Sequence, residues 1–395
     1  MTIMSEGKAF YSALSTRTGW REAVAEASSK VRGELGGVCD LALIFVTELF
    51  PGLKPAELSP VLRKELPARV LIGCNSSGVI GAKNEVEMEP AVTIMGMRLP
   101  GVRLTPFSLS PEELGRITDA EGLLRRLEIF PNEKPKFITF AEPMSCDIER
   151  WVQLFNEAYP ACPVIGGLAS GLAIGKPNWL LLNDESFDQG SVGVALSGDV
   201  NFDVVVAQGC RPIGQPLIVT KAEGHVLYEL GGKQPLEVLR DVIARLTPED
   251  QELARHSLFA GLVMNERGSH FARGDFLVRN IMGYDAQSGA LMIGASLHPG
   301  QTIQFQLRDA KTSDEDLRGL LRRLPDGHDR ARGALLVSCC GRGRGLYGEP
   351  DHDASTIQAL QGPMPMAGFF ANGEIGPVGA KNYIHGYTSS LAVIR

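Results

Sequence analysis

The residues best suited to binding chemistry stand in one glycine-rich turn, at positions 340–345. Two arginines and a cysteine alternate there with glycines, shortly after the apolar strand expected at 334–337. Glycine adopts backbone angles that are closed to other residues, so successive N–H groups can converge on one point. An arginine fork beside such N–H groups suits a carboxylate or a phosphate. The candidate ligand contacts of this turn are Cys340, Gly341, Arg342, Gly343 and Arg344.

A second candidate segment, Asn372-Gly373-Glu374, also follows an apolar run. Its amide and its carboxylate could bind the amine or the hydroxyl of a ligand. Asn372 is equally suited to supplying a left-handed turn angle, which needs no ligand. The turn at 340–345 has a similar alternative, in which the arginines are solvated and the glycines serve only tight turns. Both interpretations stay open.

Cys340 is also a candidate nucleophile. It ends an apolar strand beside two arginines, whose charge is expected to lower its pKa and to favour the thiolate. The alternative is a cysteine that packs as a small apolar side chain, because either Cys339 or Cys340 must point into the core. No histidine is adjacent in the sequence, and His352 and His385 could approach only through the fold. An enzyme is therefore an alternative hypothesis rather than the leading one.

Two familiar catalytic patterns are not supported. Gly343, Gly345 and Gly348 have the spacing of a dinucleotide-binding fingerprint, but Glu349-Pro350 displaces the helix that should begin there. The sequence lacks the Gly-x-Ser-x-Gly elbow of serine hydrolases. Its histidines show no metal-ligand spacing. We therefore expect neither a cofactor nor a metal.

The turn at 372–374 belongs to a motif that occurs three times, in residues 71–81, 164–175 and 366–376. Each copy is an apolar pair, a glycine, a short break that ends in Ser-Gly or Asn-Gly, and then Ile-Gly. Each follows an apolar strand and a helix, so the unit strand–helix–strand–turn–strand is used three times. The first copy supplies further candidate contacts at its strand end, which are Asn75, Ser76 and Ser77.

Around these motifs, apolar periodicity predicts helices over residues 20–35, 55–66, 111–129 and 148–159. Strand pairs are expected after the first two motifs, namely 91–98 with 102–109 and 191–196 with 202–207. Four strands between residues 258 and 307 suggest a further, degenerate unit.

The fold class is therefore α/β, with mixed sheets and packed helices built from repeated strand–helix–strand–strand units in two domains. The turn-rich segment 208–216 is the best candidate for a domain boundary. It gives a first domain at 1–214, with units at about 20–109 and 130–208, and a second domain at 215–395.

Composition limits the class of protein. The chain has 395 residues and a net charge of −7, which disfavours nucleic acid binding. No apolar run reaches the ~18–20 residues needed to cross a bilayer, and the first 20 residues do not resemble a signal peptide. The seven cysteines form no Cys-x-x-Cys pair, so neither a disulfide framework nor a zinc site is indicated. We expect a cytoplasmic protein that binds neither nucleic acid nor membrane.

Several of these segments together resemble the FIST family. They are the Gly-Cys-Asn-Ser-Ser-Gly turn at 73–78, the segment 209–216, the strand 279–283 and the segment 368–376. The resemblance covers nearly the whole chain from about Trp20. It implies a FIST N-terminal domain in residues 1–214 and a FIST C-terminal domain in residues 215–395. It also adds Arg279 and Asn280 to the candidate ligand contacts.

The family includes bacterial signalling proteins and a eukaryotic F-box protein, and the resemblance implies an intracellular sensory module that binds small ligands such as amino acids. We therefore predict a cytoplasmic signal-transduction protein that binds a small anionic or zwitterionic metabolite. The site is expected in a cleft at the domain junction, where turns from both halves meet. The alternatives are an enzyme that uses Cys340 and a protein-interaction scaffold. The sequence leaves open a protein signalling partner, the oligomeric state and the identity of the ligand.

Overall fold

The computed structural model describes residues 9–36, 38–171, 178–268, 270–324 and 331–395. Its contacts divide the chain into two compact units. Unit 1 comprises Met1–Val206, Leu320–Ile384 and Thr388–Arg395, and unit 2 comprises Ala207–Gly319 and His385–Tyr387. Each unit therefore contains residues from both sides of the boundary expected at 214/215. The α/β class with mixed sheets is confirmed.

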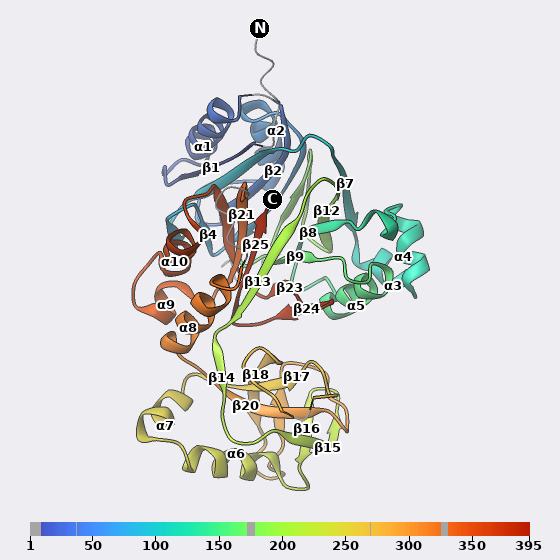
Figure 1. The fold of residues 1–395 in the computed structure, drawn as a ribbon, viewed down its shortest axis with the longest axis vertical. Helices are drawn as coiled ribbons and strands as arrows, with labels where there is room; N and C mark the ends of the chain where they lie inside the picture. Colours follow the sequence, from blue (N-terminus) through green and yellow to red (C-terminus); the bar gives the residue numbers. More distant parts are fainter. Residues whose placement is uncertain (1–8, 37, 172–177, 269, 325–330) are drawn as a thin grey trace. The chain divides into compact units, whose positions relative to one another are not determined.

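Unit 1 contains three six-stranded sheets (Figure 1). The first has the order β1 (Ala9–Ser15), β6 (Val92–Arg98), β2 (Cys39–Thr47), β3 (Ala68–Ser76), β10 (Leu180–Leu182), β11 (Glu185–Phe187). The second has the order β7 (Val102–Leu109), β12 (Ser191–Gly198), β8 (Lys136–Ala141), β9 (Val164–Leu168), β23 (Glu374–Val378), β24 (Lys381–His385). The third has the order β13 (Phe202–Gln208), β25 (Thr388–Ile394), β21 (Gly333–Cys339), β22 (Met366–Ala371), β4 (Gly78–Ile80), β5 (Glu85–Glu87).

The three sheets share one pattern of pairing. A parallel pair lies at the centre of each, β2 with β3, β8 with β9, and β21 with β22. An antiparallel strand flanks each pair, namely β6, β12 or β25. Parallel neighbours need a crossover, and helices of unit 1 provide it. These are α2 (Pro55–Glu65), α5 (Ile148–Ala158), and α9 (Gly343–Tyr347) with α10 (His352–Gln361).

The hairpin that follows each parallel pair joins a different sheet. After β3 the chain forms β4, which pairs with β22 of the third sheet. After β9 it forms β10, which pairs with β3 of the first sheet. After β22 it forms β23, which pairs with β9 of the second sheet. The three sheets are thus linked in a cycle, and the segment after each parallel pair leads from one sheet to the next. Residues 172–175, at the end of the second motif, lie outside the described residues.

The expected strand pairs are wrong in their partners. β6 pairs with β1 and β2, whereas β7 pairs along its whole length with β12. Likewise β12 belongs to the second sheet and β13 to the third. The residue alternation of a strand specifies which side is buried but not which strand lies beside it. Sequence alternation therefore leads to a prediction of pairing between consecutive strands, although the chain changes sheets between them.

The inner faces of the three sheets form one core. Leu41, Leu43 and Phe45 of β2 lie in it, while the alternate residues of β2 pack on the outside of the sheet with α1 (Trp20–Leu35) and α2. A strand buried on both faces reads as a continuous apolar run, which is why 41–46 has no polar residue. At the centre the ring of Phe45 stacks on Phe369 with centroids 4.8 Å apart and meets Phe140 edge-on at 5.2 Å. Each sheet contributes one of these rings.

The second sheet carries its own outer helices. They are α3 (Pro111–Arg116), α4 (Ala120–Leu127) and α5, with the short 3-10 helix Pro131–Glu133 before β8. The single helix expected over 111–129 is in fact two, because Asp119 accepts a hydrogen bond from the Gly122 N–H at 2.8 Å and begins a new helix. The helix expected at 20–35 is confirmed.

The first glycine of each repeated motif is required by strand contact rather than by a turn. Gly73, Gly166 and Gly368 each lie in the second strand of a parallel pair. A Cβ would lie 1.9 Å from the Ile44 oxygen at Gly73, 1.7 Å from the Thr139 oxygen at Gly166, and 1.8 Å from the Leu336 oxygen at Gly368. Any side chain there would push the two strands apart.

Unit 2 is built around a closed sheet that the chain forms between β13 and β21. Its strands pair antiparallel in the order β20, β15, β16, β19, β18, β17, and β17 returns to β20. The prediction of a further repeated unit between residues 258 and 307 is therefore wrong, because its strands form only antiparallel pairs, within this closed sheet. The elements of unit 2 are β14 (Cys210–Pro212), β15 (Leu217–Glu223), β16 (Val226–Leu230), α6 (Pro235–Ala244), α7 (Pro248–Ala254), β17 (Leu258–Val263), β18 (Phe276–Tyr284), β19 (Leu291–Ile293) and β20 (Thr302–Arg308). Helix α8 (Ala310–Leu321) leads from it back to unit 1.

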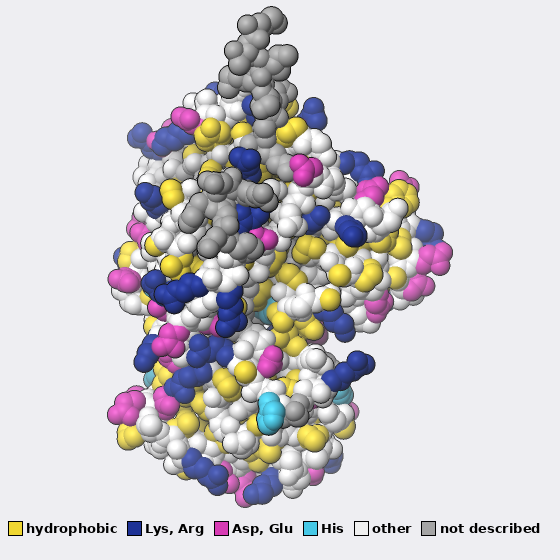
Figure 2. Space-filling model, viewed as in Figure 1, with side chains coloured by type: hydrophobic (Ala, Val, Ile, Leu, Met, Phe, Trp, Pro, Cys, Tyr) yellow, Lys and Arg dark blue, Asp and Glu magenta, His cyan; other side chains and the backbone are white. Residues whose placement is uncertain are grey.

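Surface charge is mixed. Figure 2 shows basic and acidic side chains interspersed on the face drawn. In the part of the chain that the structure describes, no helix combines the length and the apolar character that crossing a membrane requires.

Candidate functional site

Three strand ends meet in unit 1 at small polar side chains. Ser77 follows β3, Ser170 lies two residues after β9, and Cys340 follows β21, so each comes from a different sheet. The Ser77 hydroxyl oxygen lies 3.3 Å from the Cys340 sulfur and 3.4 Å from the Ser170 hydroxyl oxygen. The Ser77 N–H donates to the Ser170 hydroxyl at 3.1 Å, and that hydroxyl donates to the Phe370 carbonyl of β22. We refer to Ser77, Ser170 and Cys340 as the strand-end cluster.

Cys340 is the exposed cysteine of the chain, whereas the other six are buried. Although it reaches the surface, its thiol lies among protein atoms, and this desolvation raises its pKa; the charge of Glu374 acts in the same direction. Hydrogen bonds from Ser77 and Ser170 oppose the rise without cancelling it. The expectation of a lowered Cys340 pKa is therefore wrong.

Arg342 is fully buried. Its Nε donates to Asp353 Oδ2 at 2.8 Å and its Nη2 donates to Asp353 Oδ1 at 3.0 Å, so the carboxylate is held by both prongs of the fork. Nη2 also donates to the Tyr347 hydroxyl at 2.5 Å. Arg342 binds a carboxylate, as its type suggested, but that carboxylate belongs to α10 of the same chain.

The N–H groups of the turn are also used internally. The Cys340 N–H donates to the Ala371 carbonyl at 2.9 Å, and the Arg342 N–H donates to the Cys339 carbonyl at 2.8 Å. The Arg344 N–H donates to Glu87 Oε1 at 2.8 Å. Gly343 has a φ of 61°, and a Cβ there would lie 2.5 Å from the same carboxylate oxygen.

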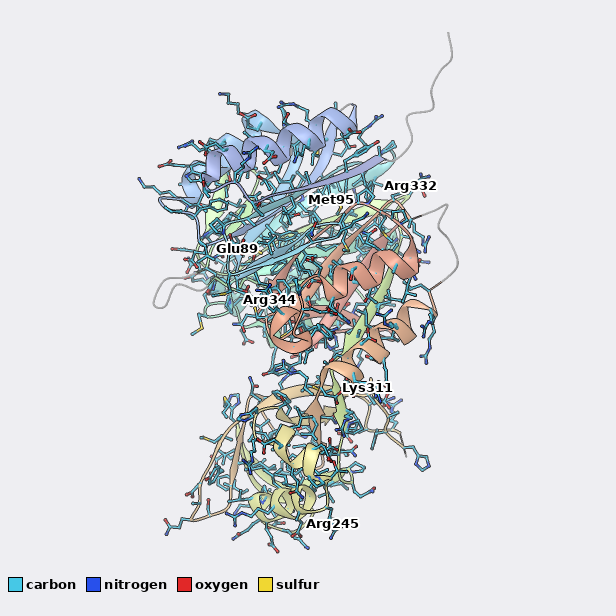
Figure 3. All side chains as sticks on the ribbon, turned by 90° about the vertical axis from the view of Figure 1, so that its left-hand side faces the viewer. Glu89, Met95, Arg245, Lys311, Arg332 and Arg344 are labelled. Carbon is cyan, nitrogen blue, oxygen red and sulfur yellow. The ribbon has the colours of Figure 1, made fainter. Side chains whose placement is uncertain are left out.

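The anions bound by this turn are thus two of the protein's own carboxylates, Asp353 and Glu87. The expectation that the Arg342 fork stands open to an external anion is wrong. The Arg344 side chain, in contrast, is exposed on the short helix α9 (Figure 3). Binding of an external ligand by Cys340, Gly341 or Arg344 stays a prediction.

In the second candidate segment, Asn372 lies at the surface and Glu374 lies in the core. Asn372 is exposed, and its N–H donates to the Leu168 carbonyl at 3.1 Å, while the Leu168 N–H donates to the Gly373 carbonyl at 2.9 Å. These bonds join the third motif to the second, two residues before Ser170. Glu374 is fully buried, so a ligand at the surface does not reach it directly.

Glu374 is held by Thr388. The N–H and the hydroxyl of Thr388 donate to Glu374 Oε2 at 3.0 and 2.8 Å. Burial raises the pKa of Glu374 to about 8, although the bonds from Thr388 and the charge of Arg342 act to lower it. At neutral pH this carboxyl group is therefore mostly protonated.

The three candidate residues of the first motif differ in burial, since Asn75 and Ser76 are buried and Ser77 is half-buried. Asn75 is buried, where its Oδ1 accepts from the Trp179 N–H at 2.9 Å and its own N–H donates to the Trp179 carbonyl at 3.1 Å. The buried Ser76 hydroxyl donates to the Gly78 carbonyl at 2.8 Å. Of the three residues selected there, Ser77 joins the strand-end cluster, and the other two fix the backbone around it.

Arg279 and Asn280 lie on β18 of unit 2, whereas every other candidate contact lies in unit 1. Asn280 Oδ1 accepts a hydrogen bond from the Tyr387 hydroxyl at 2.5 Å. Arg279 Nη1 donates to the Val278 carbonyl at 3.1 Å.

The prediction of ligand contacts did not include Ser170, Asp353, Glu87 or Thr388. Ser170 occupies the position in the second motif that Ser77 occupies in the first, so the repeat itself contained this signal. The other three carry no local signal, because their importance depends on partners elsewhere in the chain. Within the described residues, no group of three or more His, Cys, Asp or Glu side chains is placed to hold a metal ion.

Comparison with known proteins places the chain in a family. The model of the FIST N domain matches residues 40–233, and that of the FIST C domain matches residues 235–377. An uncharacterized protein of Mycobacterium tuberculosis strain H37Rv is 36% identical over 381 residues, which are 96% of this chain and 98% of that protein. An uncharacterized protein of Mycobacterium bovis is 36% identical over 378 residues, 94% of this chain and 95% of its own length.

More distant matches add little. An uncharacterized protein of Methanocaldococcus jannaschii is 22% identical over 232 residues, 56% of this chain and 44% of its own length. A crystal structure of cyanuric acid hydrolase from A. caulinodans aligns over 98% of this chain and 99% of its own, with 8% identity and a TM-score of 0.32. A score of that size supports no argument about fold or activity. The two domain matches and the mycobacterial relatives show that the chain belongs to the FIST family, whose domains are sensory domains of signal transduction.

Proposed function

We propose that this FIST protein is a cytoplasmic sensory module that binds a small zwitterionic or anionic metabolite, such as an amino acid, at the strand-end cluster. One observation carries the proposal. Ser77, Ser170 and Cys340 follow strands of three different sheets, and Ser77 lies within hydrogen-bond distance of both Ser170 and the exposed Cys340. Small hydroxyl and thiol groups at converging strand ends are able to recognise the polar atoms of a small ligand without a large change in structure.

The charges near the cluster suit an amino acid. A Cβ at Gly171, next to Ser170, would lie 2.3 Å from Glu48 Oε2 and 2.3 Å from Asn75 Nδ2, so a carboxylate borders this position. Such a carboxylate favours the ammonium group of a ligand. The exposed guanidinium of Arg344 is the cation that the neighbouring turn offers to a ligand carboxylate.

Calorimetric titration with a panel of amino acids tests the proposal. We expect one or a few of them to bind, and Ser77→Ala or Arg344→Ala to weaken that binding about tenfold, which corresponds to about 1.4 kcal/mol. Arg125→Ala is the matched control, because Arg125 is an exposed arginine on α4. Unchanged affinity in both test variants would contradict this site, and mass spectrometry of protein purified without added ligand would reveal a metabolite already bound.

A second candidate function is an enzyme that uses Cys340, and the exposure of this thiol beside two hydroxyl groups favours it. Its raised pKa acts against it, because the thiolate is the nucleophile. The pH dependence of Cys340 alkylation separates the two candidates.

A further inference from the structure

A cavity of about 700 Å³ lies in unit 1, in a different place from the strand-end cluster. It opens at the beginning of β8 and β9, whereas Ser170 follows the end of β9. The six residues of β8 separate the two edges of the sheet by about 16 Å. Its volume falls in the range of small-molecule pockets, which is about 300–1,000 Å³.

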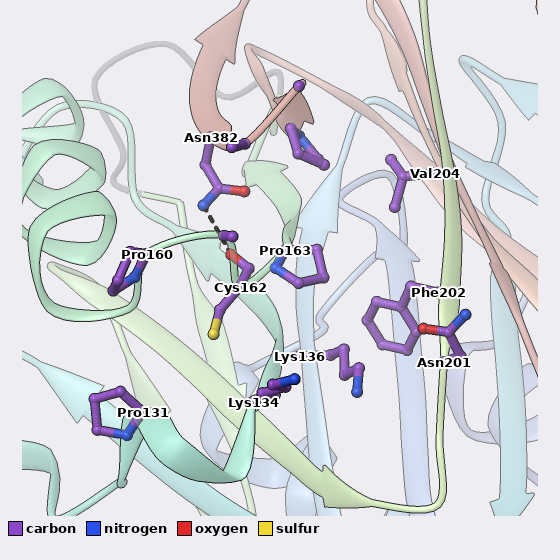
Figure 4. A pocket seen from close by; sticks show the side chains of 14 residues that line it. Pro131, Lys134, Lys136, Pro160, Cys162, Pro163, Asn201, Phe202, Val204 and Asn382 are labelled. Carbon is purple, nitrogen blue, oxygen red and sulfur yellow. Dashed lines mark hydrogen bonds between the residues drawn. The ribbon is translucent and has the colours of Figure 1, made fainter.

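Four separate segments form the walls. They are the beginning of β8 with Lys134 and Lys136, the turn before β9 with Cys162, the beginning of β13 with Phe202, and the turn before β24 with Asn382 of that strand (Figure 4). Prolines at positions 131, 160, 163 and 377 also line the cavity, and their rings restrict the backbone. The walls therefore combine rigid apolar surface with a few polar groups.

Asn382 holds two of these segments together. Its Oδ1 accepts from the Val164 N–H at 2.8 Å, and its Nδ2 donates to the Cys162 carbonyl at 3.0 Å. Asn156 of α5 accepts from the Asn382 N–H at 2.8 Å and donates to the Asn382 carbonyl at 2.8 Å. Asn382 is itself buried, so the shape of the cavity is fixed before any ligand arrives.

The charge of the cavity is positive. Lys134 and Lys136 line it, and among the described residues neither has an ion-pair partner within 4.0 Å. Glu133, the acidic residue next to Lys134, is paired with Arg103 instead. Burial raises the pKa of the Cys162 thiol, and the charges of both lysines oppose this rise.

We propose that this cavity is a second ligand site, which binds a small organic anion with a carboxylate or phosphate group and a flat apolar body. The two ammonium groups bind the anionic group, and Phe202 with the prolines packs against the apolar part. The inference does not depend on the proposed amino acid site, because it uses none of its residues.

Pyridoxal 5′-phosphate is a suitable probe, because it combines a phosphate with a flat ring and an aldehyde. The aldehyde condenses with a lysine amine with loss of water, and added borohydride reduces the resulting C=N bond to a stable amine that mass spectrometry locates. Pyridoxal, which lacks the phosphate, measures the reactivity of each lysine without anion binding. Lys83, an exposed lysine outside the cavity, is the internal reference.

We expect the ratio of labelling by the phosphate to labelling by pyridoxal to be at least about fivefold higher at Lys134 or Lys136 than at Lys83. Inorganic phosphate should protect the cavity lysines, whereas chloride at the same ionic strength should not. Lys136→Gln should abolish the excess at Lys134, while Lys54→Gln, which removes an exposed lysine outside the cavity, should leave it unchanged. Equal ratios at the three lysines, or equal protection by chloride, would overturn the proposal.

Discussion

The sulfur of Cys340 lies 3.3 Å from the hydroxyl oxygen of Ser77, although 263 positions separate the two residues in the sequence. The contact exists because β3 and β21 belong to different sheets whose ends meet. Cys340 is exposed, yet desolvation raises its pKa although the hydrogen bond from Ser77 acts to lower it, so little of it is thiolate at neutral pH.

Iodoacetamide should modify Cys340 before any other cysteine of the folded protein, because the other six are buried. The rate should be low at pH 7 and should still be rising with pH at pH 9 instead of levelling off, since the Cys340 pKa is raised above its ordinary value. Mass spectrometry against pH measures the rate, with Cys340→Ser as the control. A rate that reaches its plateau below pH 8 would instead favour the enzyme hypothesis.

Gly73→Ala should destabilise unit 1 by about 3 kcal/mol or more, because the new Cβ would lie 1.9 Å from the Ile44 carbonyl oxygen. Urea unfolding monitored by fluorescence measures the loss. Gly33→Ala is the matched control, since its position on α1 has no atom within 4 Å of a new Cβ. This control should gain about 0.5–1 kcal/mol from the better helix propensity of alanine. Equal effects of the two changes would mean that the strand contact is not the reason for Gly73.

Arg342→Met should cost about 3–5 kcal/mol at neutral pH, because it leaves Asp353 charged and buried without its partner. Burial alone would raise the Asp353 pKa, but Arg342 and the hydrogen bond from His352 outweigh it and hold this pKa well below its usual range. A carboxyl group with a lowered pKa stabilises the fold above its unfolded pKa of about 3.9, and this contribution is lost as the pH falls towards the folded value.

The difference in stability between Arg342→Met and the wild type should therefore shrink below about pH 4. Arg332→Met, which removes an exposed arginine, should change stability by less than about 0.5 kcal/mol. Urea unfolding between pH 3 and pH 8 tests both statements, and a constant difference across this range would contradict the role of the ion pair.

Glu374→Gln should stabilise the protein at pH 8 by on the order of 2–4 kcal/mol relative to the wild type, with no gain at pH 4. Burial raises the Glu374 pKa from 4.5 to about 8, so the folded state holds a proton that the unfolded state releases in this interval. The wild type therefore loses stability as the pH rises from about 4.5 to 8, and the glutamine does not. Thermal unfolding at several pH values measures this, and the exposed Glu89→Gln is the control. Parallel pH profiles for the wild type and Glu374→Gln would contradict it.

Local features of the fold could be predicted from the sequence. The helix at 20–35 follows from the spacing of its apolar residues and has the predicted limits. The three motifs predicted three equivalent strand ends, and two of the motif serines do meet, at Ser77 and Ser170. Such predictions succeed because the periodicity of apolar residues and the presence of a motif are local properties of the chain.

The partners of strands and charges could not be predicted in the same way. Glu87, which accepts from the Arg344 N–H, precedes it by 257 positions, and no local pattern links them. Asp353 is only 11 positions from Arg342, but α9 and the turn after it decide whether the two side chains meet. A guanidinium among glycines therefore looks the same in the sequence whether its carboxylate is internal or comes from a ligand.

The exchange of hairpins among the sheets has a consequence for synthesis. The β4–β5 hairpin finds its neighbour on β22, about 290 positions further along the chain. At a translation rate of about 5–20 residues per second, β22 is synthesised about 15–60 s after the hairpin. The outer edge of the hairpin stays unpaired for that time. During this interval Val79, which is fully buried in the finished protein, has no sheet to cover it. The nascent chain should therefore be most vulnerable to aggregation and most dependent on chaperones until its last strands have emerged.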